Sequence, residues 1–205
     1  MIRAFVGAGG KTTLIHQQAA FFRAEGKRVF VTTSTHMFIE PDTLLTDSAQ
    51  DIIRQLERTG YAMAGIPEGE KIRSLSPETY RRVCEYADVV LVEADGSNRK
   101  PVKYPKAGEP VIYDNVEDIV VVCGLHAIGK PVQEAAHRLE LVKRCLGATE
   151  ETLLTLEHLQ KLTLEGYVRP LGEQHPGVKI SVYAAGGTQA EREAFLREMK
   201  KEGCL

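Results

Sequence analysis

The sequence carries no large excess of charge of either sign. Its 26 Lys and Arg residues are balanced by 28 Asp and Glu residues, which gives a formal net charge of -2. A protein that binds nucleic acid or an anionic membrane through its overall electric field needs a surplus of positive charge. We therefore expect neither nucleic acid nor a membrane surface as a partner.

The sequence also lacks paired cysteines and long apolar segments. Cys84, Cys123, Cys145 and Cys204 are scattered and form no C-x-x-C pair, which favours reduced thiols over a disulfide framework or a structural zinc site. No apolar stretch approaches the roughly 18 residues that cross a bilayer, and the first residues read as a strand rather than a signal peptide. We expect a cytoplasmic protein.

The residues that are present favour a single α/β domain over 1–205. The chain has 205 residues, 43% of them hydrophobic, and no internal repeat, which is enough for one core. Strand-like and helix-like segments alternate, so right-handed crossovers predict a mostly parallel sheet with helices on both faces. Strands are expected near 2–6, 28–33, 87–92, 118–124 and 178–184, and a hairpin within 61–75. Helices are expected near 12–25, 49–58, 77–86, 132–146 and 188–202, with a further helix capped by Thr149.

The most informative motif is GAGGKTT, from Gly7 to Thr13, directly after the first apolar strand. Three glycines let successive backbone N–H groups approach an anion, Lys11 can reach β- and γ-phosphate oxygens, and Thr12 can ligate Mg²⁺. The predicted nucleotide-binding residues are Gly7, Ala8, Gly9, Gly10, Lys11, Thr12 and Thr13. Strand, loop and helix in this order predict a P-loop NTPase-like fold that binds Mg²⁺ and ATP or GTP.

The loop departs from the usual pattern, because Phe5 stands where G-x-x-x-x-G-K-[ST] has its first glycine. The motif is thus the shortened G-x-x-G-K-T. The alternative interpretation is an ordinary glycine-rich turn between strand and helix with an exposed lysine.

Two polar clusters follow other strands and complete the predicted site. Glu93 and Asp95 end the apolar strand at 87–92, where P-loop proteins place an acid that holds Mg²⁺. We assign Asp95 to binding the metal and Glu93 to positioning or deprotonating a nucleophile. The two roles could be exchanged, and both acids could instead cap the start of the loop. The run Thr32–His36 offers Thr35 to the metal and His36 as a catalytic group, with turn capping as the alternative.

The loop that follows Asp95 is rich in proline and cations. Arg99, Lys100 and Lys103 could face a phosphorylated or carboxylated second substrate, or could form a solvated basic loop. His126 and the pair His137-Arg138 are weaker candidates, because histidines and arginines near helix ends commonly serve structure.

The motifs VGAGGKTT, TTSTH, VEADGSNRKPVK, EPVI, GLHAIGKPV and HRLE occur in this order. Together they resemble the YqeC family, described as accessory proteins of selenium-dependent molybdenum hydroxylases. The likeness spans nearly the whole chain and is most specific at Gly7–Thr13, Thr32–His36 and Glu93–Lys103. It implies a P-loop NTPase-like fold, a cytosolic role in maturing a molybdenum enzyme, and a molybdenum hydroxylase or its cofactor-maturation proteins as partner.

The expected activity is Mg²⁺-dependent NTP hydrolysis or phosphoryl transfer, with Lys11, Glu93 and His36 as catalytic residues. GTPase-like relatives read guanine with N-K-x-D after the last strand, whereas this chain has YAAGG at 183–187, so we favour ATP. Two alternatives stay open. The shortened loop also resembles that of Mur-type ATP-dependent ligases, and a non-catalytic adaptor gated by nucleotide would need the same loop.

Overall fold

The computed structural model describes residues 1–203, so Cys204 lies outside the described residues. These residues divide into two compact units. The first contains residues 1–5, 12–96 and 111–117, and the second contains residues 6–11, 97–110 and the chain from Asp118 onward. The single domain expected over 1–205 stays a prediction.

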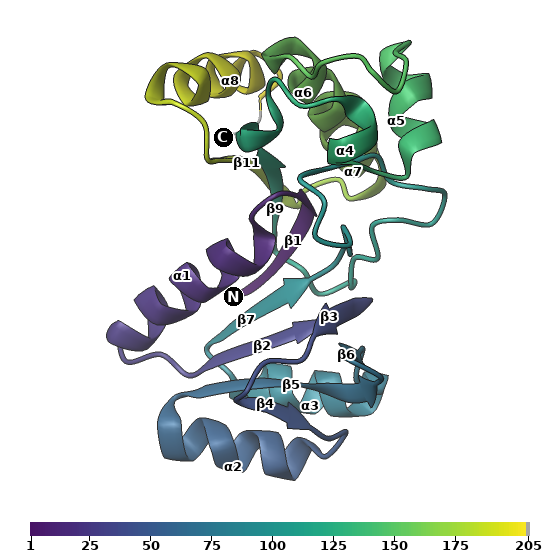
Figure 1. Cartoon of the computed structure of the whole chain (residues 1–205). Coiled ribbons are helices and arrows are strands. Elements are labelled where there is room, and N and C mark those ends of the chain that lie inside the picture. The colour runs from purple at the N-terminus through teal and green to yellow at the C-terminus, as the bar shows by residue number, and fades with distance from the viewer. Residues whose placement is uncertain (204–205) are drawn as a thin grey trace. The chain divides into compact units, whose positions relative to one another are not determined.

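The first unit is built on parallel strands in the order β1-β7-β2-β5, with β4 also parallel to β5. β6 and β3 extend the arrangement in antiparallel fashion beyond β5 (Figure 1). Their bounds are β1 Ile2–Ala8 (residues 2–5 in this unit), β2 Val29–Thr33, β3 His36–Phe38, β4 Thr43–Leu45, β5 Tyr61–Glu68, β6 Lys71–Arg73 and β7 Val89–Glu93. Phe5 and Thr33 both pair with Glu93, so the last residue of β7 lies between β1 and the last residue of β2.

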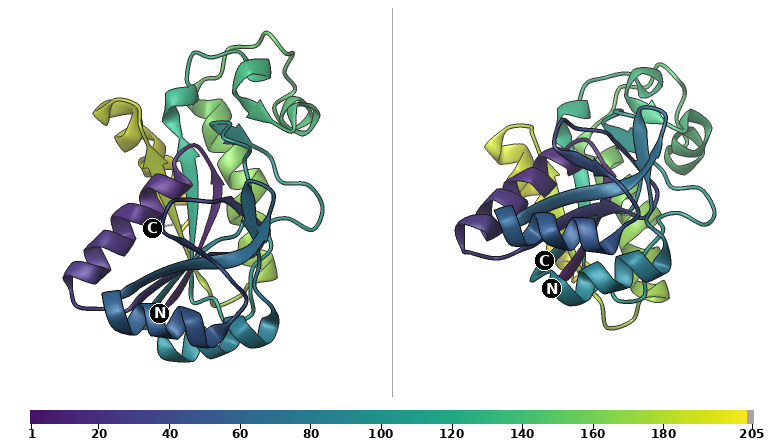
Figure 2. Two further views of the ribbon diagram at one scale, coloured as in Figure 1. Left: turned by 60° about the horizontal axis from the view of Figure 1, so that its bottom comes forward. Right: turned by 90° about the horizontal axis from the view of Figure 1, so that it is seen from below.

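Helices cover both faces of this sheet. α2 (Ala49–Thr59) and α3 (Pro77–Tyr86) pack on Ala62 and Ala64 of β5 in one apolar cluster. Tyr61 and Met63, which alternate with those alanines, line a groove together with Ala19 of α1 (Lys11–Ala24). Because successive strand residues point to opposite faces, α1 lies on the face opposite α2 and α3, as Figure 2 shows.

Local capping signals set the predicted helix boundaries in this unit. Ser48 accepts a hydrogen bond from the backbone of Asp51 at the start of α2, and Gly60 ends that helix in the left-handed conformation. Ser76 and Pro77 open α3. The hairpin expected within 61–75 is present as β5 and β6, whereas β3 and β4 were not predicted.

The second unit is centred on β9 and β11, which run parallel over seven paired residues from Lys179↔Asp118 to Ala185↔Gly124. α6 packs on β9 and α8 packs on β11. The strands are β8 Val102–Lys103, β9 Asp118–Gly124, β10 Ala136–His137 and β11 Lys179–Ala185. The helices are η1 Leu125–Ala127, α4 Val132–Ala135, α5 Leu139–Leu146, α6 Leu156–Thr163, the π-helical η2 Leu164–Val168, α7 Arg169–Gln174 and α8 Gln189–Lys201.

Two helix predictions in this unit are wrong. The helix expected over 132–146 is split into α4 and α5, because Ala136 and His137 pair with β8 and Arg138 takes a left-handed conformation with φ of 64°. Thr149 caps no helix: its hydroxyl and backbone N–H both contact the Thr152 hydroxyl in a turn, and Thr155 caps α6 instead. The helical stretch from Leu164 to Gln174 was not predicted.

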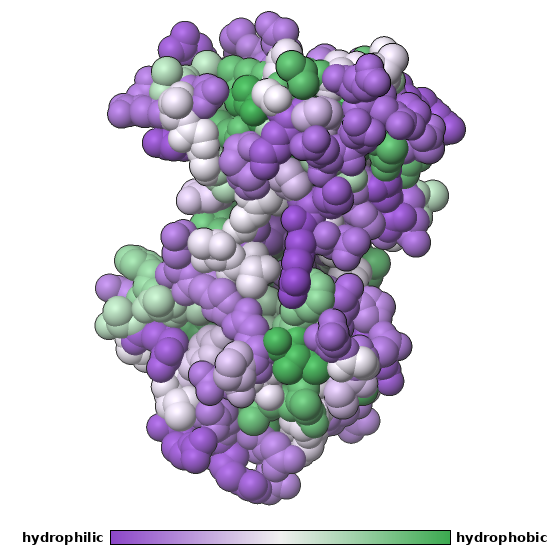
Figure 3. All heavy atoms as spheres, viewed as in Figure 1, coloured by the Kyte–Doolittle hydropathy of each residue, from purple (hydrophilic) through white to green (hydrophobic). Residues whose placement is uncertain are grey.

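The fold class is confirmed as α/β with a mostly parallel arrangement of strands and flanking helices. On the face drawn in Figure 3, hydrophilic residues cover most of the visible surface and hydrophobic atoms appear in scattered patches. Among residues 1–203, no helix combines the length and the apolar character that a bilayer crossing requires.

Candidate functional site

The glycine loop joins the end of β1 to the start of α1, and its glycines are required by the backbone. Gly7, Gly9 and Gly10 have φ values of 86°, 81° and 147°, a region that other residues adopt only at a cost. A Cβ on Gly7 would lie 2.2 Å from the carbonyl oxygen of Val122, and one on Gly9 would lie 2.6 Å from the Cα of Gly124. The loop therefore packs directly on the carboxyl-end half of β9, inside the second unit.

Lys11, the first residue of α1, lies folded over this loop. Its side-chain ammonium donates a hydrogen bond to the carbonyl oxygen of Gly7 at 2.6 Å, and the residue is only 4% exposed. An ordinary turn with an exposed lysine does not describe this geometry. The loop thus holds an ammonium group beside the backbone N–H groups at a helix N-terminus, which is the arrangement that attracts phosphate.

Thr12, the second residue of α1, contacts the acid at the end of β7. Its hydroxyl donates to the carboxylate oxygen Oε2 of Glu93 at 3.4 Å, within the first unit. Thr12 itself is exposed, as is Thr13. A hydroxyl and a carboxylate this close present two oxygen atoms of the type that Mg²⁺ prefers.

Asp95 and Glu93 are both buried polar residues of the first unit. Asp95 is fully buried and Glu93 is 7% exposed. A carboxylate is stable in such a position only when hydrogen bonds or a cation compensate for the lost water. Their burial favours a role inside a site over the alternative of simple acids that begin a surface loop.

The hydroxyls of the Thr32–His36 run have different partners. Thr32 donates to Ala64, Thr33 donates to Glu93 and Ser34 donates to Val111, each to a backbone carbonyl oxygen at 2.6 to 2.9 Å. These three hydroxyls hold strands and loop together. The Oγ1 of Thr35 is also buried, yet it makes no hydrogen bond within residues 1–203.

His36 points to a different neighbour. Its Nε2 lies 2.5 Å from Oε2 of Glu68, and both side chains are about half exposed. The imidazole therefore forms a surface pair between β3 and β5, and its proposed catalytic role requires that this pair opens.

The three cations predicted for a second substrate all lie in the second unit, in different environments. Arg99 is exposed and has a positive φ of 59°. The ammonium group of Lys100 donates a hydrogen bond to the backbone carbonyl oxygen of Glu134 at 2.7 Å. Lys103 has a side chain only 1% exposed and lies 2.8 Å from a carboxylate oxygen of Glu109. Sequence reasoning missed Glu109, although it is an acid placed among the lysines of a proline-rich loop.

His126 belongs to η1, at the end of β9. A Cβ on Gly124 would lie 2.8 Å from its ring, and one on Gly186 would lie 3.3 Å from its Nδ1. Burial and the nearby Lys130 lower the pKa of His126, and a hydrogen bond to Ala185 opposes them. The ring thus lies beside Gly124, the last residue of β9, and Gly186, which follows β11.

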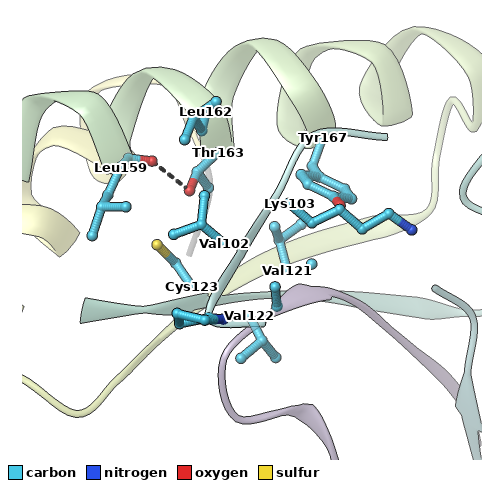
Figure 4. Close-up of a pocket in the computed structure, with 12 residues that line it drawn as sticks. Val102, Lys103, Val121, Val122, Cys123, Leu159, Leu162, Thr163 and Tyr167 are labelled. Carbon is cyan, nitrogen blue, oxygen red and sulfur yellow. Dashed lines mark hydrogen bonds between the residues drawn. The ribbon is translucent and has the colours of Figure 1, made fainter. Parts of the chain in front are cut away.

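A small cavity lies between α6 and β9 in the second unit (Figure 4), and Gly7 and Ala8 of the glycine loop also line it. Val121 and Cys123 of β9, Leu159 and Leu162 of α6, and Lys103 line it. Its volume of about 20 Å³ is room for about one water molecule. Burial raises the pKa of the Cys123 thiol to about 12, so this cysteine packs as an apolar residue.

The residues of the first unit fit a magnesium ion. Residues 1–203 contain no cluster of three or more His, Cys, Asp or Glu side chains suited to a metal. Mg²⁺ needs no such cluster, because it is commonly held by one or two carboxylates together with nucleotide phosphates. Thr12, Thr35 and Asp95 supply oxygen atoms of the required kind. The buried Thr35 hydroxyl makes no hydrogen bond within residues 1–203, which favours a metal ion as its partner.

The family model described as YqeC protein matches residues 3–140, more than half of the chain. The chain belongs to the YqeC family. A relative from Escherichia coli (strain K12), named Uncharacterized protein YqeC, is 33% identical over 169 residues, which cover 77% of this chain and 65% of the relative. The chain thus spans less than two thirds of that YqeC protein's length.

A solved structure, that of a ParA family ATPase from Chlorobium tepidum TLS, also matches this YqeC family member. The likeness covers 96% of this chain and 88% of that chain, with 15% sequence identity and a TM-score of 0.43. The relationship is a distant one.

Proposed function

We propose that this protein binds a nucleoside triphosphate together with Mg²⁺ and hydrolyses it or transfers its γ-phosphoryl group. The observation that carries the proposal is the glycine loop with the Lys11 ammonium folded over it. The loop N–H groups from Gly7 to Gly10 would hold the phosphates. Lys11 would leave the carbonyl of Gly7 and move to β- and γ-phosphate oxygens.

The metal ligands in this proposal are Thr12, Asp95 and Thr35. Bound Mg²⁺ would neutralise charge on the phosphates during transfer. The contact between Thr12 and Glu93 supports a carboxylate at this position, and Glu93 would then orient or deprotonate the attacking water or acceptor. His36 is the second candidate for that role, once released from Glu68.

Arg99, Lys100 and Lys103 would face the second ligand. Arg99 is exposed, Lys100 donates a hydrogen bond to the Glu134 carbonyl oxygen, and Lys103 forms an ion pair with Glu109. For the base we favour adenine, because the turn after β11 carries Gly186 and Gly187 in place of a guanine-reading N-K-x-D motif. Competition between ATP and GTP in calorimetry tests this, and a clear preference for GTP contradicts it.

Membership of the YqeC family supports a cytoplasmic accessory role in the maturation of a selenium-dependent molybdenum hydroxylase. In that setting the partner is the hydroxylase or its cofactor-maturation proteins. A nucleotide-gated adaptor would show partner affinity that changes with nucleotide while turnover stays negligible. A Mur-type ligase would release ADP only with an amino-acid or peptide acceptor.

Steady-state release of phosphate from ATP and GTP tests the enzyme proposal. Replacing Lys11 by Ala removes a charge that stabilises the transition state, so we expect turnover to fall by roughly a hundredfold or more. Glu93→Ala should also lower turnover, because it removes the group proposed to orient or deprotonate the attacking water or acceptor. Asp114→Ala, at an exposed acid in the same unit as Glu93, is its control. Full turnover in Lys11→Ala would show that the glycine loop is not the site.

A further inference from the structure

One carboxylate in the second unit is held by cations from two separate segments. The Nζ of Lys103 lies 2.8 Å from Oε2 of Glu109, and an Nη2 of Arg138 lies 2.5 Å from Oε1. Lys106 approaches the same Oε1 at 3.9 Å. Three positive charges thus surround a single negative one, and each carboxylate oxygen has its own cation.

Backbone hydrogen bonds hold together the two segments that carry Lys103 and Arg138. β8 and β10 pair in parallel, with Val102 opposite Ala136 and His137 opposite Lys103. Lys100 adds a hydrogen bond to the carbonyl of Glu134. Lys103 and Arg138 are therefore held at a set separation by the backbone, as the two sides of a preorganised clamp would be.

Arg138 carries two unfavourable features at once. Its backbone is left-handed, with φ of 64° and ψ of 57°, which costs free energy for any residue with a Cβ. Its Nε atom is buried and makes no hydrogen bond in the part of the chain that the structure describes. Strain and an unsatisfied buried donor at the same residue are typical of ligand clamps rather than of structural ion pairs.

Glu109 supplies an ionised carboxylate at the position where an anionic ligand would bind. Burial raises its pKa, but Lys103, Arg138 and Lys106 outweigh burial and hold the pKa below the ordinary value. The carboxylate is thus ionised at neutral pH. Lys103, whose side chain is 1% exposed, needs an anion at this position whenever no other anion is present.

We propose that Lys103 and Arg138 form a binding site for an oxyanion of the second ligand, a carboxylate or phosphate group, and that Glu109 occupies this site until the ligand displaces it. The inference rests on the proposed function, since it specifies the chemistry of the second ligand. It adds Arg138 as a binding residue and Glu109 as the group that keeps the site filled. The ligand would enter from the side of Arg138, because the Arg138 side chain is 25% exposed and the Lys103 side chain only 1%.

The experiment measures anion binding by calorimetry in a Lys11→Ala background, in which the glycine loop has lost its ammonium. Inorganic phosphate and succinate are the two probes. We expect Glu109→Ala to bind one of them at least tenfold more tightly than the background protein, because the internal competitor is gone. Adding Arg138→Ala should abolish this gain. Glu151→Ala, at an exposed acid of the same unit, should leave affinity unchanged.

The tighter probe identifies the anion class, and either result supports the site. An unchanged affinity in Glu109→Ala, or a gain that survives Arg138→Ala, would overturn the proposal and leave a structural clamp. Glu109→Gln, which keeps the shape, is the second variant if Glu109→Ala does not fold. If neither folds by circular dichroism, Glu109 is indispensable and the proposal also fails. Nucleotide binding by the wild-type protein is measured separately. Failure of the proposed nucleotide site can therefore be distinguished from failure of the proposed oxyanion site.

Discussion

The hydroxyl of Thr12 lies 3.4 Å from the Oε2 atom of Glu93, which joins the second residue of α1 to the last residue of β7. The two residues are far apart in sequence. Parallel pairing of β1 with β7, which places Phe5 opposite Glu93, brings them to the same edge of the sheet. Ligands of parallel α/β sheets bind at this edge.

Gly7→Ala should destabilise the protein more than a comparable glycine substitution elsewhere. The added Cβ would meet the Val122 carbonyl oxygen at 2.2 Å, in a backbone with φ of 86°. Gly129→Ala is the matched control, because Gly129 has φ of 80° but open space around its Cβ position. We expect a loss of about 1 kcal/mol for the control and at least about 2 kcal/mol more for Gly7→Ala, from strain and displaced backbone. Urea denaturation measures both, and equal losses would contradict the close approach.

Thr35→Val tests whether the Thr35 hydroxyl binds the metal ion or stabilises the fold. The Thr35 Oγ1 has no hydrogen-bond partner among residues 1–203, so its removal should leave the free energy of unfolding unchanged or raise it by about 1 kcal/mol. The Mg²⁺ dependence of nucleotide binding should weaken. The control is Thr33→Val, which loses a buried hydrogen bond to the Glu93 carbonyl and should cost about 1–3 kcal/mol. A destabilised Thr35→Val with unaltered Mg²⁺ dependence would remove Thr35 from the metal site.

Asp88 should make stability depend on pH in the acid range. Hydrogen bonds from the Arg28 side chain and backbone hold the pKa of Asp88 well below its ordinary value. A depressed pKa means that the stabilisation is complete above the unfolded-state pKa of about 3.9 and is lost as the pH falls through the folded-state pKa. Asp88→Asn should therefore lower the melting temperature at pH 7, and the difference from wild type should shrink below about pH 3.

Asp114→Asn, at an exposed acid of the same unit, is the control for the Asp88 measurement. It should show little difference from wild type at any pH. A gap for Asp88→Asn that stayed constant down to pH 2 would show that the substitution acts through packing rather than charge.

Features decided by neighbouring residues were predictable from the sequence. The Ser48 cap and the Gly60 stop set α2, the Ser76-Pro77 pair set the start of α3, and β9 has the bounds expected from its apolar run. Each depends on residues within a few positions, where capping and hydrophobic patterning act.

Features decided by distant partners were not predictable. β10 forms because Ala136 and His137 pair with β8. This pairing overrides the helical pattern of residues 132–146. The same holds at the candidate site, since the sequence indicated Lys103 but gave no sign that Glu109 and Arg138 meet beside it. The same holds for the four adjacent hydroxyls of residues 32–35: backbone carbonyl oxygens distant in sequence accept hydrogen bonds from Thr32, Thr33 and Ser34. The Thr35 hydroxyl makes no hydrogen bond within residues 1–203.

The most direct test of the account is calorimetric titration of the wild-type protein and of Lys11→Ala with ATP and GTP in the presence of Mg²⁺. The account predicts one nucleotide bound per wild-type chain and at least a hundredfold weaker binding in Lys11→Ala, with the urea midpoints of the two proteins similar. Equal affinity in the two proteins, or no heat of binding with the wild-type protein at millimolar nucleotide, would contradict it.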